Sequence, residues 1–181
     1  MDDIVKAALA KWPNVPHCYG WLALDARGDW YLRDEQAQAA GPFPLVKGSR
    51  VDHEKLREFI ERNYAADDAG CWFFQNGPQR VYVQLEAAPW VWRLHADAAN
   101  NAGGTLRIVS HTGRQAQMQS VCLDEHGRVF IDTDLGLGLV HTLDMELAAD
   151  AIDGGTWAPR EARFETLPQR FGYRLQPSPS P

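Results

Sequence analysis

Side chains able to carry out acid–base or metal chemistry are present in this chain, but few of them have a useful spacing. None of the six histidines forms an H-x-x-x-H or H-E-x-x-H pair, which would place two ligands on one helical face. Asp132 and Asp134 alternate within a predicted strand, so both carboxylates face the same side, and His141 follows them. One hypothesis from this pattern is a small hydrolase or metal-dependent enzyme that uses His141 with Asp132 and Asp134.

Motifs for nucleophilic or cofactor chemistry are missing from the sequence. The three cysteines, Cys18, Cys71 and Cys122, form neither a CxxC motif nor a disulfide framework. A G-x-S-x-G motif is absent, and the glycines of 136–138 make only half of a dinucleotide fingerprint, for which close packing of a strand is the simpler explanation. We therefore expect no catalytic residue, no metal ion and no cofactor.

Aromatic residues are the most distinctive feature of the sequence. Seven Trp, seven Phe and five Tyr occur among 181 residues, and many lie in predicted strands beside arginines. An exposed face of this kind stacks rings of a ligand, whereas a buried one fills the core. The first interpretation favours a non-catalytic binding or regulatory module that contacts a protein or a small molecule through an aromatic-lined groove. The predicted ligand-binding residues are Trp72, Tyr82, Trp90, Trp92 and Arg93.

The charge of the chain disfavours nucleic acid and membrane partners. Its formal net charge is −6 at pH 7, which repels phosphate backbones and anionic lipids. Residues 124–153 carry eight acids against Arg128 alone, which indicates a solvated face or, in a third interpretation, a docking surface for a basic partner. We expect a monomer or a homodimer.

The first residues and the cysteines favour a cytoplasmic location. The sequence MDDIVK is acidic where a secretion signal would be basic, and no apolar h-region follows it. No apolar stretch approaches the roughly 18 residues that a membrane span needs. The lack of a disulfide pattern is typical of a reducing compartment.

Short segments with two-residue periodicity predict a β-rich fold. The expected class is α+β, with about nine short strands in a mostly antiparallel sheet, because D-x-x-G turns at 25–28 and 124–127 join neighbouring strands directly. An N-terminal helix is predicted over residues 3–12. A second helix, over 52–64, carries an apolar stripe that should pack on a sheet face.

The predicted domain organisation is a single β-rich globular domain over residues 1–153. The two D-x-x-G hairpins share one pattern, which raises the hypothesis of two similar halves, 18–95 and 104–153. Residues 154–181 are expected to form an extended C-terminal tail with a disordered end.

Three segments of the sequence resemble a known group of proteins. Residues 28–31, 80–90 and 130–134 read GDWY, RVYVQLEAAPW and FIDTD. They resemble landmarks of small proteobacterial domain-of-unknown-function proteins, from which this chain departs at Ala87 and Asp134. The resemblance implies a mostly β, cytoplasmic bacterial protein without an assigned activity, and it transfers no catalytic residue.

Overall fold

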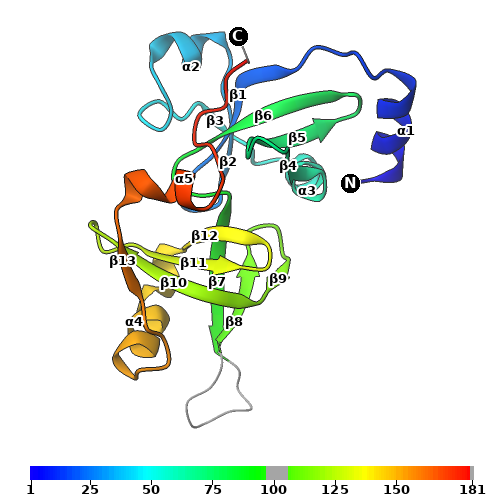
Figure 1. Cartoon of the computed structure of the whole chain (residues 1–181). Helices are drawn as coiled ribbons and strands as arrows, with labels where there is room; N and C mark the ends of the chain where they lie inside the picture. The colour runs from blue at the N-terminus through cyan, green and yellow to red at the C-terminus, as the bar shows by residue number, and fades with distance from the viewer. Residues whose placement is uncertain (97–105, 180–181) are drawn as a thin grey trace. The chain divides into compact units, whose positions relative to one another are not determined.

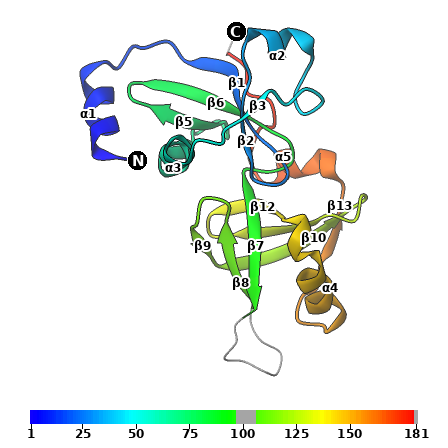
Figure 2. The same cartoon turned by 180° about the vertical axis from the view of Figure 1, so that it is seen from behind.

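The structure is a computed structural model that describes residues 1–96 and 106–179 (Figures 1 and 2). Two compact units make up the chain: unit 1 contains 1–25, 29–86 and 172–181, and unit 2 contains 26–28 and 87–171. Each unit has its own β-sheet and its own core. The chain is thus divided after residue 86, within the segment 1–153 that the sequence predicts as one domain.

Unit 1 is built on a six-stranded sheet with the order β3-β2-β1-β6-β5-β4. The two central strands, β1 and β6, are parallel, and the outer strands on each side are antiparallel to their neighbours. The strands are β1 (Cys18–Leu24), β2 (Trp30–Leu32), β3 (Ser49–Arg50), β4 (Tyr64–Ala66), β5 (Trp72–Asn76) and β6 (Gln79–Leu85).

Three helices belong to unit 1: α1 (Asp3–Lys11), α2 (Glu35–Ala40) and α3 (Glu54–Arg62). Helix α3 packs on the sheet, with the Phe59 and Phe74 rings 5.4 Å apart at an interplanar angle of 84°. Helices α1 and α3 correspond to the two predicted helices. The start of α3 is fixed by His53, whose Nδ1 accepts a hydrogen bond from the backbone N–H of Leu56 at 3.3 Å.

A buried arginine organises the connection between β2 and β3. The Arg33 guanidinium donates to the carbonyl oxygens of Val46 at 3.1 Å and Gly41 at 2.6 Å, and to Oε1 of Gln84 at 2.6 Å. Arg33 is 2 % exposed. These bonds offset the cost of burying its charge and fix the loop that follows Leu32.

Unit 2 is built on a seven-stranded sheet with the order β13-β10-β11-β12-β7-β8-β9. Its strands are β7 (Trp90–Ala96), β8 (Leu106–Ser110), β9 (Gln115–Ala116), β10 (Met118–Asp124), β11 (Val129–Thr133), β12 (Gly136–Val140) and β13 (Arg160–Ala162). Two α-helices follow β12 along the chain, α4 (Met145–Asp153) and α5 (Leu167–Arg170), and the short 3-10 helices span Thr142–Asp144 and Phe164–Thr166.

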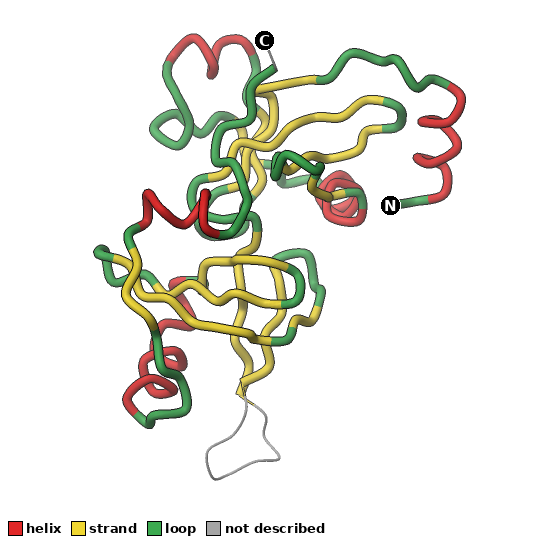
Figure 3. The backbone as a smooth tube through the Cα atoms, in the orientation of Figure 1, coloured by secondary structure: helices red, strands yellow, loops and turns green. Residues whose placement is uncertain are grey.

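The two sheets, whose strands are drawn in yellow in Figure 3, share one strand order. In each sheet, the first three strands in sequence lie side by side from the centre to one edge. The next three lie side by side from the other side of the sheet back to the centre. The first and the sixth of these strands are therefore neighbours, and they pair in parallel. This order relates β1–β6 to β7–β12, so its boundaries differ from the predicted halves 18–95 and 104–153. The two D-x-x-G turns occupy different places: one leaves a central strand, β1, and the other leaves β10, on the far side of β11 from the centre.

The strand number and the pairing differ from the prediction. Thirteen strands lie in the described residues, rather than about nine, and both sheets are mixed. The α+β class itself is correct. Strands of two or three residues, such as β3 and β9, are too short to show a periodic pattern, and parallel pairs join segments that no local turn connects.

The C-terminal residues are folded further than a tail would be. Strand β13 pairs in parallel with the edge of β10, and the backbone N–H of Leu85 donates to the carbonyl of Leu175 at 2.8 Å. Tyr173 is buried. Both contacts satisfy backbone groups at strands that would otherwise be exposed, which explains why the predicted tail 154–181 is ordered over most of its length.

Two tryptophans pack closely on a glycine in the core of unit 2. The rings of Trp90 and Trp92 lie 5.9 Å apart and nearly parallel, on β7 next to β12. A Cβ atom added to Gly138 would overlap the indole Nε1 of Trp92. The sequence interpretation of close strand packing at 136–138 is therefore confirmed at Gly138.

We predict that Gly138→Ala destabilises the protein by about 1–3 kcal/mol, because the added methyl group overpacks the core. The measurement is urea unfolding of the two proteins. The matched control is Gly138→Ala in a Trp92→Phe background, where the smaller ring leaves room and the cost of the methyl should fall. Equal costs in both backgrounds would contradict the packing argument.

Candidate functional site

The five predicted ligand-binding residues are divided between the two units. Trp72 and Tyr82 belong to unit 1, whereas Trp90, Trp92 and Arg93 belong to unit 2. Trp90 and Trp92 are 1 % and 0 % exposed, and their indole N–H groups donate to the carbonyls of buried turns and strands at 2.7 and 3.0 Å. Rings that are fully buried and hydrogen-bonded cannot contact a ligand, so the prediction is wrong for both tryptophans.

Trp72 and Tyr82 lie on opposite faces of the six-stranded sheet. Tyr82 is paired with Phe73, and side chains alternate along a strand, so Trp72 points to the other side. The Tyr82 hydroxyl donates to Oδ2 of Asp67 at 2.9 Å, and burial together with this carboxylate raises the pKa of Tyr82 to about 12. The hydroxyl stays protonated and holds a loop, which is a structural role.

Arg93 is bound by a buried carboxylate. Its guanidinium donates to both oxygens of Asp144, at 2.6 and 3.2 Å, and the backbone N–H of Leu94 donates to the same carboxylate at 3.0 Å. Burial raises the pKa of Asp144, but the bonds from Arg93 and Leu94 outweigh it and hold that pKa below its usual value. This pair fixes the start of the segment that leads into α4.

The residues of the predicted hydrolase or metal site do not converge. By the register of β11 with β12, His141 lies four residues along the strands from Asp132, a separation of about 13 Å. Nδ1 of His141 accepts from Leu143 N–H at 3.0 Å, and Asp134 accepts from Gln117 N–H at 2.7 Å. Across residues 1–96 and 106–179, no group of three or more His, Cys, Asp or Glu side chains is placed to hold a metal ion. The arrangement overturns this hypothesis, because the three side chains do not converge, and His141 and Asp134 each accept a hydrogen bond from a backbone N–H instead.

Unit 1 contains a groove between α3 and one face of its sheet, with a volume of about 330 Å³. Strand alternation places Leu22, Leu32, Phe74 and Val81 on this face, and the three-to-four-residue spacing of the α3 stripe turns apolar side chains toward it. The lining residues are Cys18, Trp21, Leu22, Leu32, Leu56, Phe59, Ile60, Phe74, Asn76 and Val81.

A local irregularity in β1 brings Trp21 to the groove. The register of β1 against β6 shifts between Cys18 and Leu22, and Gly20 within this interval has φ +79°, a conformation that other residues rarely adopt. The extra residues let Trp21 lie beside Leu22 in the lining instead of alternating to the opposite face.

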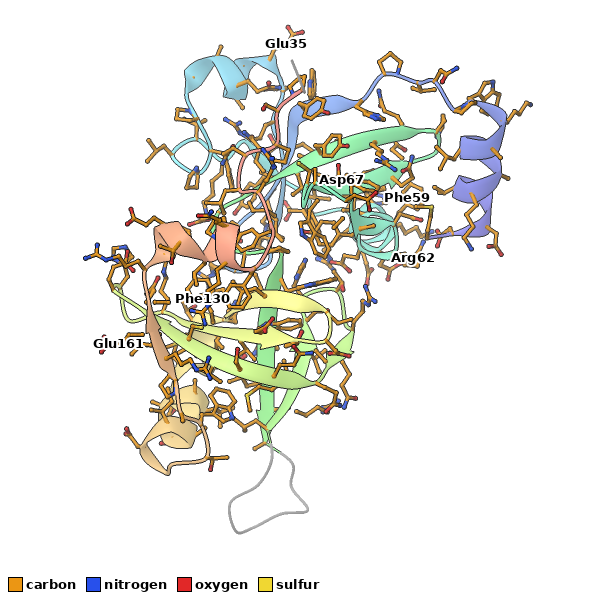
Figure 4. All side chains as sticks on the ribbon, in the orientation of Figure 1. Glu35, Phe59, Arg62, Asp67, Phe130 and Glu161 are labelled. Atoms are coloured by element: carbon orange, nitrogen blue, oxygen red, sulfur yellow. The ribbon has the colours of Figure 1, made fainter. Side chains whose placement is uncertain are left out.

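Large apolar side chains remain partly exposed at this groove. Trp21 is 42 % exposed, Leu32 is 46 % exposed and Leu56 is 36 % exposed, while Leu22 and Ile60 at its floor are buried. Phe59 projects from the same helix as Arg62 (Figure 4). Solvent-exposed apolar groups gathered around one concavity are typical of a ligand or partner site.

The chemistry available in the groove is that of binding. Its ten lining residues include no carboxylate, amine, guanidinium or imidazole. The only titratable group is the thiol of Cys18, and burial raises its pKa. A thiol is unreactive until it loses its proton, so a raised pKa makes Cys18 a poor nucleophile.

Two further cavities lie in unit 2, with volumes of about 500 and 340 Å³. The larger one is bordered by β10 and β13. Two of its three lining acids are engaged: Asp124 accepts from the Arg128 guanidinium at 2.7 Å, and Glu125 accepts from the Phe164 N–H at 2.8 Å. These bonds are structural, and they also show that part of the acidic segment 124–153 is neutralised within unit 2.

Comparisons with known proteins were consistent with the sequence landmarks. The family model DUF2944, whose description reads "Protein of unknown function (DUF2946)", matches residues 1–178. The chain belongs to this family. No curated protein matches it. The resemblance to domain-of-unknown-function proteins is therefore confirmed.

Two solved structures are similar to this chain at low sequence identity. A DUF1285 family protein from Silicibacter pomeroyi DSS-3 has a TM-score of 0.53 at 12 % identity, with 83 % of this chain and 84 % of that chain covered. A DUF1285 family protein from Shewanella baltica OS155 has a TM-score of 0.48 at 16 % identity, covering 72 % and 91 %. At such identities the first similarity shows a common fold alone. No helix in the described part of the chain could cross a membrane.

The sequence predicts the helical side of the groove but not the residues that the sheet contributes. The stripe of Leu56, Phe59 and Ile60 on α3 was visible from its spacing. Trp21 and Leu32 are not among the predicted ligand-binding residues, although the Gly-Trp pair at 20–21 carries a signal, since glycine within a strand often marks a bulge.

We predict that Asp144→Asn lowers the free energy of unfolding by about 1–3 kcal/mol at pH 7, because a charged partner of Arg93 is lost. The folded pKa of Asp144 lies below its usual value of 3.8, so its carboxylate stabilises the protein above that value and ceases to do so as the pH falls further.

The stability difference between wild type and Asp144→Asn should thus shrink when urea unfolding is repeated between pH 5 and pH 2.5. Asp150→Asn, at an exposed position of α4, is the control and should change stability little at any pH. A difference for Asp144→Asn that does not vary with pH would exclude the charge as its source.

Proposed function

We propose that this protein is a non-catalytic binding module whose ligand occupies the apolar groove of unit 1. The observation that carries the proposal is the joint exposure of Trp21, Leu32 and Leu56 around a cavity of about 330 Å³. Removing apolar surface from water is favourable by about 25 cal/mol for each Å². A ligand that covers these side chains gains this free energy. The volume falls in the range of small-molecule sites.

The chemistry of the lining supports binding without turnover. Acid–base catalysis needs a group that exchanges protons near neutral pH, and the lining offers only a thiol of raised pKa. We therefore assign the aromatic-lined groove of the sequence hypothesis to different residues, with Trp21, Phe59 and Phe74 supplying the rings.

The partner in this proposal is a small molecule, and neither nucleic acid nor membrane is expected. A net charge of −6 and an uncharged lining both oppose the binding of phosphate groups. We further propose that the protein acts in the cytoplasm, where its three free cysteines would stay reduced.

We predict that the wild-type protein binds N-phenyl-1-naphthylamine, an uncharged apolar fluorophore, and that Trp21→Ala or Leu32→Ser weakens binding about tenfold. Each variant removes apolar contact at the groove mouth, and a factor of ten corresponds to about 1.4 kcal/mol. The measurement is a fluorescence titration. Leu143→Ser, which alters an exposed leucine of unit 2, is the control and should bind like wild type. Loss of binding in the control alone, or equal binding in all proteins, would refute the proposal.

We also predict that the fluorophore protects Cys18 from alkylation. Cys18 lines the groove, whereas Cys71 and Cys122 are buried elsewhere, so mass mapping of maleimide-treated protein should show slower labelling at Cys18 only. Equal labelling of Cys18 with and without the fluorophore would place the bound probe outside the groove.

Sedimentation tests whether a second copy of the chain, and not a small molecule, fills the groove. A dimer that Leu32→Ser converts to a monomer would show that a second copy fills it.

A further inference from the structure

The lining of the groove can be placed in order along the sheet, because the strand register fixes each residue. Leu32 on β2 pairs with Leu22 on β1, and Val81 on β6 pairs with Phe74 on β5. The groove therefore crosses four adjacent strands, β2-β1-β6-β5. Three inter-strand spacings give it a length of about 14 Å.

The polarity of the lining changes from one end of this path to the other. At the β2 end the lining is mainly hydrocarbon, from Leu32, Leu22, the α3 stripe and the Trp21 ring, whose indole N–H is the one polar group there. At the β5 end it includes Asn76, which provides the only side-chain amide of the lining. The thiol of Cys18, whose Cα partner is Val81, lies toward this second end. One end therefore suits a hydrocarbon chain, and the other suits a group that makes hydrogen bonds.

Arg80, the charged residue closest in sequence to Asn76, faces away from the groove. Arg80 precedes Val81 on β6, and its guanidinium lies 4.4 Å from the ring of Phe73, on the opposite face of the sheet. No charged side chain occurs in the lining itself. Asn76 is exposed, so an ionised head keeps part of its water there, but the lining offers it no counter-charge, whereas the amide offers an uncharged head both a donor and an acceptor.

We propose that the ligand is a single-chain amphiphile with an uncharged hydrogen-bonding head, held with its head at Asn76 and its chain toward Leu32. This inference rests on the proposed function, because it takes the groove as the binding site. The Asn76 amide both donates and accepts, so it can bond a hydroxyl or a neutral amide, and the apolar walls cover the chain.

The experiment compares three ligands that share one chain, 1-octanol, octanoate and octylammonium, as competitors of N-phenyl-1-naphthylamine at pH 7. We expect 1-octanol to displace the fluorophore at a concentration about threefold below either charged ligand, because only part of the head's water is lost at an exposed residue. Among alcohols of increasing length, each added methylene should improve displacement about fourfold until the chain fills the groove.

Two variants test the place of the head. Asn76→Leu should weaken 1-octanol about fivefold while N-phenyl-1-naphthylamine binds as before, since one hydrogen bond is lost. Asn76→Asp should reverse the preference toward octylammonium, which gives a gain of binding that misfolding cannot mimic. Asn14→Leu, at an exposed position outside the groove, is the control.

The outcomes separate the two proposals. If the fluorophore does not bind the groove, the proposed function itself fails. If it binds but octanoate or octylammonium competes as well as 1-octanol, or if neither Asn76 variant changes the order of the three ligands, the uncharged head at Asn76 is wrong and the binding function stands.

Discussion

The parallel pairing of β1 with β6 is the constraint on which unit 1 depends. Most of the unit lies between these two strands in sequence, and their pairing forces the intervening chain to return from β3 across the sheet to β4. That return passes through α3, which is why a helix covers one sheet face. A helix of nine residues is only about 13 Å long, whereas six strands span about 24 Å. Part of the apolar face therefore stays uncovered, and the groove lies there.

Unit 2 has the same strand order, but different side chains form its core. Its central strands, β7 and β12, carry Trp90, Trp92 and Gly138, which pack closely enough that no methyl group fits at the glycine. Buried carboxylates, Asp124 and Asp144, each bind an arginine and fix a turn or a helix start. The aromatic residues of unit 2 thus serve stability, whereas the exposed ones of unit 1 surround a concavity. Aromatic residues thus have different roles in the two units, because those of β7 are buried and Trp21 in unit 1 is exposed.

The lining of the unit 1 groove is uncharged, and the proposed binding function rests on this. Without a carboxylate, amine or imidazole in the lining, proton transfer has no carrier there, and the raised pKa of Cys18 keeps its thiol protonated. What remains is the transfer of apolar surface out of water, which is strong but non-directional. In our proposal, direction comes from the single side-chain amide at the β5 end, which would distinguish one end of a ligand from the other.

The sequence by itself determined the local elements: the helices near 3–12 and 52–64, the D-x-x-G hairpins, the α+β class and the family landmarks. These follow from periodicity and turn chemistry, which act between residues that are close in the chain. Only the tertiary structure decided the parallel pairs, the division after residue 86 and the burial of Trp90 and Trp92, because these depend on which distant strands meet. The candidate groove likewise combines parts that local sequence predicts with parts that only tertiary pairing determines. The α3 stripe could be read from spacing, but Trp21 joins it through a register shift against β6, a partner that local sequence does not identify.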